Sequence, residues 1–362
     1  MRLGRRFAGA LLALCAVGVG LLLAGCGSSS STKTLTLGYV TGPTHPYGLA
    51  LAQFAAQVDK ASGGKLKIKL LPTYGGGNDL TLLNDIKGNT VNMGSVSASI
   101  WDTEGVTTFQ ALQMPFLITN YAIEKKVLDS ASPNIQQEML TNQQYGPPKL
   151  GLHGLAIHEG GIRKPVSTGA CITTLQGFSG KKMRVAPGVL LTDGIKALGA
   201  VPTPMALSEV YLSLKSGLVN SLEANYGLVY TNKYYEVSKC ITGNVNLWPF
   251  PTVLSINNTS WNGLSSQEQG WINTAAASLS DESLAIVSNP ASPLVANICA
   301  TGMKIGKAST TALTDMRNAQ NGVYAQYTAT QPTGSFVSQI EAIKATVAPP
   351  TPAPLPAGCA AP

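Results

Sequence analysis

Two strand patterns separated by one helix pattern, near the start of the chain, constrain the fold most. Residues 34–40 alternate apolar and polar side chains, and after Gly42 and Pro43 an apolar stripe recurs at helical spacing from Tyr47 to Val58. The run KLKIKLL then alternates again. This order predicts an α/β fold with a mostly parallel sheet, and such sheets bind ligands beyond the carboxyl ends of their strands.

A second short helix is predicted over residues 78–86, with Leu80, Leu83 and Ile86 on its buried stripe. The run YGGGND at 74–79 precedes it. Because this run lacks both G-K-[ST] and G-x-G-x-x-G, we interpret it as a flexible turn and not as a phosphate-binding loop.

Later patterns are mainly helical. LSEVYLSLKSG reads as an amphipathic helix that Ser208 caps and Gly217 ends. A long Ala-rich helix is predicted over 266–288. The final run, APPTPAPLPAGCAAP, is too rich in proline for a helix or a central strand, so it predicts an extended tail.

The first 26 residues indicate export. Three arginines among the first six residues precede an uncharged apolar run, which is the pattern of a signal peptide. The run ends LAGC, which resembles a bacterial lipobox and implies that Cys26 is lipidated and becomes the mature N-terminus. A transmembrane anchor is the alternative, and Arg5-Arg6 leaves twin-arginine export open beside the general secretory route.

Size and charge narrow the class of protein. Removing residues 1–25 leaves 337 of the 362 residues, which suits two lobes better than one. The whole chain carries a formal charge of +7, of which the signal peptide accounts for three. The remaining charge is small and scattered, so it does not indicate a nucleic-acid partner.

Four cysteines remain in the mature chain, and an even number in an oxidising compartment predicts two disulfides. They are Cys171, Cys240, Cys299 and Cys359. No pair has C-x-x-C spacing and the chain has only three histidines, so we expect no metal site and no cofactor. His158-Glu159 is the nearest approach to an acid–base pair, but adjacent residues of an extended chain point to opposite faces, so no enzyme is indicated.

The stretch KKMRVAPG at 181–188 raises a separate question. Met183 and Val185 alternate as the apolar face of a strand, which places Arg184 on the opposite face. An arginine there is either solvated or directed at a ligand, since burial of an unpaired guanidinium is costly. The local sequence leaves both readings open.

A longer stretch resembles a known family. GKKMRVAPGVLLTDGIKALGAVPTPMALSEVYLSLKSGLVNSLEANY is similar to the DctP-like solute-binding proteins of TRAP transporters in its arginine strand, its L-G-A-x-P-x-P-M turn and its E-V-Y helix. HPYGLALAQFAAQVDKASGGKLKIKLLP, FQALQMPFLITN and NKYYEVSKCITG agree, so the likeness covers roughly residues 34–346. It implies a periplasmic-binding-protein-like fold, with two α/β lobes, crossing strands, a long spanning helix and a ligand cleft between the lobes.

The resemblance also implies a binding site. The arginine that grips a ligand carboxylate in the family falls on Arg184, and Arg163 is the candidate for a second arginine. Where relatives use an asparagine on the ligand this chain has Ala224. Either Asn225 or Tyr226 reaches the same place, or this contact is missing. Further candidates for the cleft wall, chosen by location, are His45, Tyr47, Ser97 and Trp248.

Domain boundaries follow from the same likeness. We expect a signal peptide at 1–25, a tether at 26–33, the first lobe at 34–154, the second at 155–245, a return to the first at 246–346 and a Pro-rich tail at 347–362. The fold would allow Cys171 to pair with Cys240, and Cys299 with Cys359, which would join the tail to the first lobe.

The function that the resemblance implies is capture of a small organic acid. The expected protein is a monomer, anchored outside the cytoplasm by the lipid on Cys26. It would deliver its ligand to a small and a large integral-membrane permease subunit driven by an ion gradient. The alternative is a binding protein that feeds a membrane receptor.

Overall fold

The computed structural model describes residues 32–129, 134–348 and 355–361. The expected signal peptide and Cys26 lie outside these residues. None of the helices in the described part is long and apolar enough to cross a membrane.

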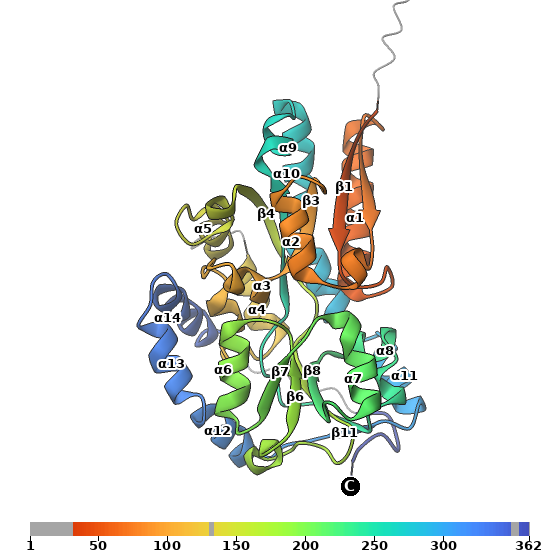
Figure 1. The fold of residues 1–362 in the computed structure, drawn as a ribbon, viewed down its shortest axis with the longest axis vertical. Helices are drawn as coiled ribbons and strands as arrows, with labels where there is room; N and C mark the ends of the chain where they lie inside the picture. Colours follow the sequence, from red (N-terminus) through yellow and green to blue (C-terminus); the bar gives the residue numbers. More distant parts are fainter. Residues whose placement is uncertain (1–31, 130–133, 349–354, 362) are drawn as a thin grey trace, which may run out of the picture. The chain divides into compact units, whose positions relative to one another are not determined.

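The first lobe is built on a five-stranded sheet (Figure 1). β1 pairs in parallel with β2 and β3, whereas β10 pairs antiparallel with β3 and with β4. The sheet is therefore mixed and not mostly parallel, because β10 enters it from the second lobe and not through a helical crossover. The strands, in spatial order, are β2 (Leu66–Leu71), β1 (Lys33–Tyr39), β3 (Met93–Ser97), β10 (Pro251–Asn257) and β4 (Leu152–Glu159).

Helices cover this sheet, and the longest of them, α10, packs along β4 and α1. Ser265 accepts from the backbone N–H of Glu268 and the Glu268 carboxylate accepts from that of Ser265, so α10 begins with a capping box. The helices of this lobe are α1 (Pro46–Ser62), α2 (Asp79–Lys87), α3 (Ala98–Thr103), α4 (Tyr121–Leu128), α5 (Ile135–Thr141), α9 (Asn258–Asn262), α10 (Ser266–Val287), α13 (Asn321–Thr328) and α14 (Thr333–Lys344).

The second lobe is built on a six-stranded mixed sheet. In spatial order its strands are β11 (Lys304–Gly306), β9 (Cys240–Thr242), β5 (Lys164–Ser167), β8 (Ser221–Ala224), β6 (Lys182–Val185) and β7 (Val201–Pro204). Its helices are α6 (Val189–Ala197), α7 (Val210–Ser216), α8 (Tyr226–Thr231), α11 (Leu294–Ala300) and α12 (Thr310–Asn318). Figure 1 shows α6 and α7 flanking β6, β7 and β8.

Two local expectations are wrong. The segment expected to form one helix begins with a 3₁₀ turn at Leu207–Glu209. The carboxylate of Glu209, and not the side chain of Ser208, caps this turn by accepting from the N–H of Ala206. Gly217 ends α7 in the left-handed conformation, as predicted. On α2, Leu80 is 40% exposed, because Leu82 takes its place on the buried face beside Leu83.

Residues 246–346 were expected to return to the first lobe, but part of this range lies in the second lobe. β11 pairs with β9 in the second sheet, and α11 packs on α8.

The chain crosses from the first lobe to the second and back through paired segments. Arg163 donates to the carbonyl of Trp248 and Leu247 donates to the carbonyl of Arg163, so the crossing lies near 160–163 and 247–250 and not at 155 and 245.

Both disulfides have the expected pairing. Cys171 joins Cys240 and Cys299 joins Cys359, with Cα separations of 5.1 and 5.2 Å. The second bond ties the tail to the second lobe and not to the first, because Ala360 pairs with Ile305 of β11 and the Cys359 side chain is buried in that lobe's core.

Candidate functional site

A cavity of about 260 Å³ lies between residues of the two lobes. From the first lobe it is lined by the segment after β1, by the glycine-rich turn before α2 and by α3. From the second it is lined by the segments after β6 and β7, and the crossing residues Arg163 and Phe250 also face it. The site therefore lies beyond the carboxyl ends of parallel strands, where α/β sheets generally bind ligands.

Arg184 is on the cavity wall, and it is not a solvated surface residue, because it is only 3% exposed. Its neighbours Met183 and Val185 point into the core of the second lobe, as the alternation of the strand predicts. Nη1 donates to Glu223 Oε1 at 3.0 Å and Nη2 donates to the carbonyl of Met205 at 3.0 Å. These contacts fix the guanidinium and leave three of its five N–H donors without a protein partner among the described residues.

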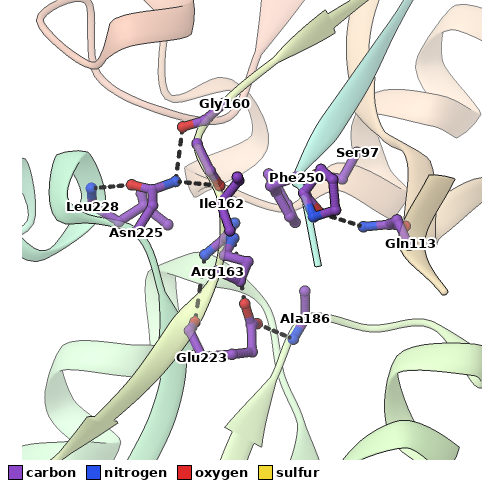
Figure 2. A network of polar contacts seen from close by, with 12 residues as sticks. Ser97, Gln113, Gly160, Ile162, Arg163, Ala186, Glu223, Asn225, Leu228 and Phe250 are labelled. Atoms are coloured by element: carbon purple, nitrogen blue, oxygen red, sulfur yellow. Dashed lines mark hydrogen bonds and ion pairs between the residues drawn. The ribbon is translucent and has the colours of Figure 1, made fainter. Parts of the chain in front are cut away.

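Arg163 contacts the same carboxylate (Figure 2). It pairs with Oε2, whereas Arg184 pairs with Oε1. Its Nε is 3.3 Å from Glu223 Oε2, and its guanidinium carbon is 3.6 Å from the centre of the Phe250 ring. Burial lowers the pKa of Arg163 from its ordinary value, and the charge of Glu223 opposes that shift. One carboxylate thus holds two buried guanidinium groups, and the cluster keeps a net positive charge.

Glu223 is itself held by the backbone. Its Oε1 accepts from the N–H of Ala186 at 2.8 Å (Figure 2). The same oxygen accepts from Arg184. The residue is fully buried in β8, between β5 and β6, so three adjacent strand segments supply the carboxylate and the two arginines.

His45 and Tyr47 line the cavity as expected. The His45 Nδ1 accepts from the N–H of Tyr47 at 3.4 Å, and the two rings pack edge to face at 4.8 Å. Burial, together with the charge of Arg163, lowers the pKa of His45 to about 3. The imidazole is therefore neutral at physiological pH and adds no positive charge to the site.

Four other candidates do not line the cavity: Asn225, Tyr226, Ser97 and Trp248. Asn225 caps α8 by accepting from Leu228 and donates to the carbonyls of Gly160 and Gly161, so it clamps the crossing strand (Figure 2). The close approach requires glycine at 161, where φ is 117° and a Cβ would lie 2.9 Å from the Asn225 side chain.

The remaining candidates have structural surroundings. The Tyr226 ring lies 5.6 Å from the Lys164 ammonium, and Trp248 is fully buried in the core of the second lobe. Ser97 does not line the cavity itself, but its hydroxyl and its N–H donate to the carboxylate of Asp79, which does. Ala224, at the position where the resemblance implied an asparagine, is buried in the second-lobe core.

Several residues on the cavity wall were not predicted, among them Thr41, Asp79, Ser99 and Phe250. The glycine-rich turn at 74–79 was a usable signal, since three consecutive glycines with positive φ bring the chain to the N-terminus of α2 at the cavity. No sequence pattern marked Glu223, which stands in the run NSLEAN, as part of the site. Within the described residues no cluster of three His, Cys, Asp or Glu side chains is arranged to hold a metal ion.

Comparison with known proteins shows the family of the chain. The family described as "Bacterial extracellular solute-binding protein, family 7" matches residues 37–331. The C4-dicarboxylate-binding periplasmic protein DctP of Rhodobacter capsulatus is 27% identical over 279 residues, 77% of this chain and 80% of that protein. The 2,3-diketo-L-gulonate-binding periplasmic protein YiaO of Escherichia coli is 27% identical over 242 residues, 67% and 71% of the two chains.

Solved structures show the same fold. The sugar acid binding protein DctPAm of Advenella mimigardefordensis, in complex with galactonate, superposes with a TM-score of 0.78 at 24% identity, covering 86% of this chain and 98% of that one. A TRAP solute-binding protein of Sulfurospirillum deleyianum with bound succinate gives 0.77 at 21% identity, covering 86% and 99%. The chain therefore belongs to the DctP family of TRAP solute-binding proteins, a family of extracellular binding proteins for transport and not of enzymes.

Proposed function

We propose that this protein captures a small organic acid through the carboxylate of the ligand and delivers it to the membrane subunits of a TRAP transporter. The observation that carries the proposal is the arginine pair around Glu223. Two guanidinium groups share one carboxylate, so these three side chains together carry a net positive charge on a buried wall of the cavity. A bound carboxylate would neutralise it and would accept from donors of Arg184 that have no partner among the described residues.

The relatives support an acid as the ligand. Those with stated ligands are named for binding a C4-dicarboxylate or a sugar acid derivative, and the solved structures hold galactonate and succinate. All of these carry at least one carboxylate, which matches the part of the site formed by Arg184 and Arg163.

The proposal includes closure of the lobes around the ligand. The paired segments near 160–163 and 247–250 connect the lobes at the expected hinge, and Asn225 holds one of them. A ligand stabilises the closed form by the difference between its contacts in the two forms. Closure would also exclude water and strengthen the contacts of the arginines with the carboxylate.

The cellular location is proposed from the sequence. Lipid on Cys26 would anchor the protein to the outer face of the cell membrane, and the short polar segment 27–32 would tether the lobes near the permease subunits. We expect the variant Cys26→Ser to move into the soluble fraction after export. A variant that stays with the membranes would refute the lipid anchor.

A thermal-shift screen of organic acids tests the binding function. A ligand at 100 times its dissociation constant adds about 2.7 kcal/mol of stability, so we expect a rise in Tm on the order of 5 °C. Mass spectrometry of the recovered ligand should show no turnover. The proposal fails if amines or neutral sugars raise the Tm and carboxylic acids do not.

A further inference from the structure

The N-terminus of α6, in the second lobe, is in contact with α3 of the first lobe (Figure 1). Gly188 precedes α6 and lies so close to α3 that a Cβ on it would be 2.8 Å from the Cβ of Ser99. The Leu190 side chain is buried in the apolar core of the first lobe. One turn further along α6, Asp193 accepts from the Tyr327 hydroxyl of α13 at 2.8 Å. The two lobes are therefore in direct contact beside the cavity, as a closed form requires.

The first turn of α6 takes its cap from the other lobe. Gly188 occupies the N-cap position and has no side chain, so it leaves the first N–H groups of the helix without a side-chain acceptor. Asp102 of α3 supplies one, because its Oδ2 accepts from the N–H of Val189 at 3.0 Å and from that of Leu190 at 3.1 Å. The dipole of the helix also favours a carboxylate at this end. We call these two hydrogen bonds the interlobe cap.

Asp102 is held in place by its own lobe. The Gln110 side-chain amide donates to Oδ1 of Asp102, and the amide oxygen of Gln110 accepts from the Thr333 hydroxyl at 2.7 Å. Gln110 and Thr333 are both buried. Burial raises the pKa of Asp102, and the donors on α6 and on Gln110 oppose this shift because they favour the ionised form. Contacts that do not depend on α6 therefore orient the carboxylate for the interlobe cap.

From these contacts we infer that Asp102 is a positioning residue for ligand capture, which holds the lobes closed by capping α6 without touching the ligand. Asp102 is not among the described residues that line the cavity. The inference rests on the closure that is part of the proposed function, and it names a residue that sets how firmly the closed form is held. Opening of the lobes would separate the carboxylate from the helix, so the interlobe cap stabilises the closed form alone. It slows release of a bound acid and leaves entry into the open form unchanged.

Stopped-flow fluorescence of the variant Asp102→Ala tests the inference. The probes are galactonate, succinate and the acid that gives the largest rise in Tm in the screen. Loss of a helix N-cap corresponds to a factor of roughly two to thirty, so we expect the dissociation rate constant to rise by that factor. The association rate constant should stay within about twofold of the parent value. A merely structural role for Asp102 would lower the stability of the ligand-free protein without this selective change in release.

The variant Val189→Pro tests the same contact from the second lobe. Proline is favoured at the first helical position and has no N–H, and the Val189 side chain is 52% exposed. The variant should therefore keep α6 intact and lose one bond of the interlobe cap, with faster release. Added to Asp102→Ala, it should change release by less than about twofold, because no bond is left to remove. Asp315→Ala, at an exposed position of α12, is the control and should leave both rate constants unchanged.

The outcomes separate the interlobe cap from the proposed function. If the parent binds an acid and Asp102→Ala releases it at the parent rate, the inference is overturned and acid binding stands. Additive effects of the two changes also overturn it. If circular dichroism shows that Asp102→Ala does not fold, Val189→Pro decides, and release at the parent rate overturns the inference. If no acid of the screen binds the parent, the proposed function fails and the inference fails with it.

Discussion

Replacement of Arg184 by alanine is the most direct test of the arginine wall. The change removes a buried cation that is 3.0 Å from Glu223 Oε1, and both side chains of this pair are at most 4% exposed. Breaking a buried pair costs about 3–5 kcal/mol. Glu223 keeps the N–H of Ala186 and the ion pair with Arg163, so we expect a loss of folding stability near the lower end of this range.

The loss of ligand affinity is worked from the same geometry. A carboxylate bound by Arg184 would lose a two-point contact of charge-assisted hydrogen bonds, worth about 1.5–3 kcal/mol each. The resulting 3–6 kcal/mol corresponds to a fall of roughly two to four decades in affinity, at about 1.4 kcal/mol per decade. Arg184→Lys keeps the charge but not the planar fork, so we expect an intermediate loss.

The assay is calorimetric titration of each variant with the acid that the screen identifies, after circular dichroism and urea unfolding have established the folded fraction. Lys182→Ala is the matched control, because it removes a cation from an exposed position on the same strand. The affinity of this control variant for the acid should lie within a few-fold of that of the parent protein. A folded Arg184→Ala protein that also binds within a few-fold of the parent would refute the role of Arg184.

The remaining predictions concern stability. Burial and the neighbouring Glu159 carboxyl raise the pKa of Glu124 well above its ordinary value, so its contribution to stability is present below pH 4.5 and falls as the pH rises toward the folded-state pKa. Glu124→Gln should therefore stabilise the protein more at pH 8 than at pH 5 in urea unfolding; the same difference at both pH values would contradict this. Asn225→Ala removes the α8 cap and two bonds to the crossing strand, and should cost about 2–4 kcal/mol of unfolding free energy; a loss below about 0.5 kcal/mol would contradict the clamp. Changing Cys171 and Cys240 together to serine opens a bond across 69 residues and should cost about 2–4 kcal/mol, and an unchanged urea midpoint would refute it.

Local patterns determined most of the secondary structure. The apolar stripe from Tyr47 to Val58 became α1, and the alternation around Arg184 became β6 with Met183 and Val185 in the core. These elements could be predicted because neighbours in sequence determine which face of a helix or strand is apolar. The direction of Arg184 toward a cleft required the family resemblance as well.

The electrostatic arrangement of the site was decided by the tertiary structure. Glu223 is 39 residues from Arg184 and 60 from Arg163 along the chain, and the carboxylate joins them only because β8 lies between β5 and β6. Leu80 faces the cavity and is exposed, because Leu82 and not Leu80 packs on the buried face of α2. The place of the tail likewise depends on a strand pairing of Ala360 with Ile305. Periodicity describes one element at a time, whereas these contacts depend on the register and order of strands that are distant in sequence.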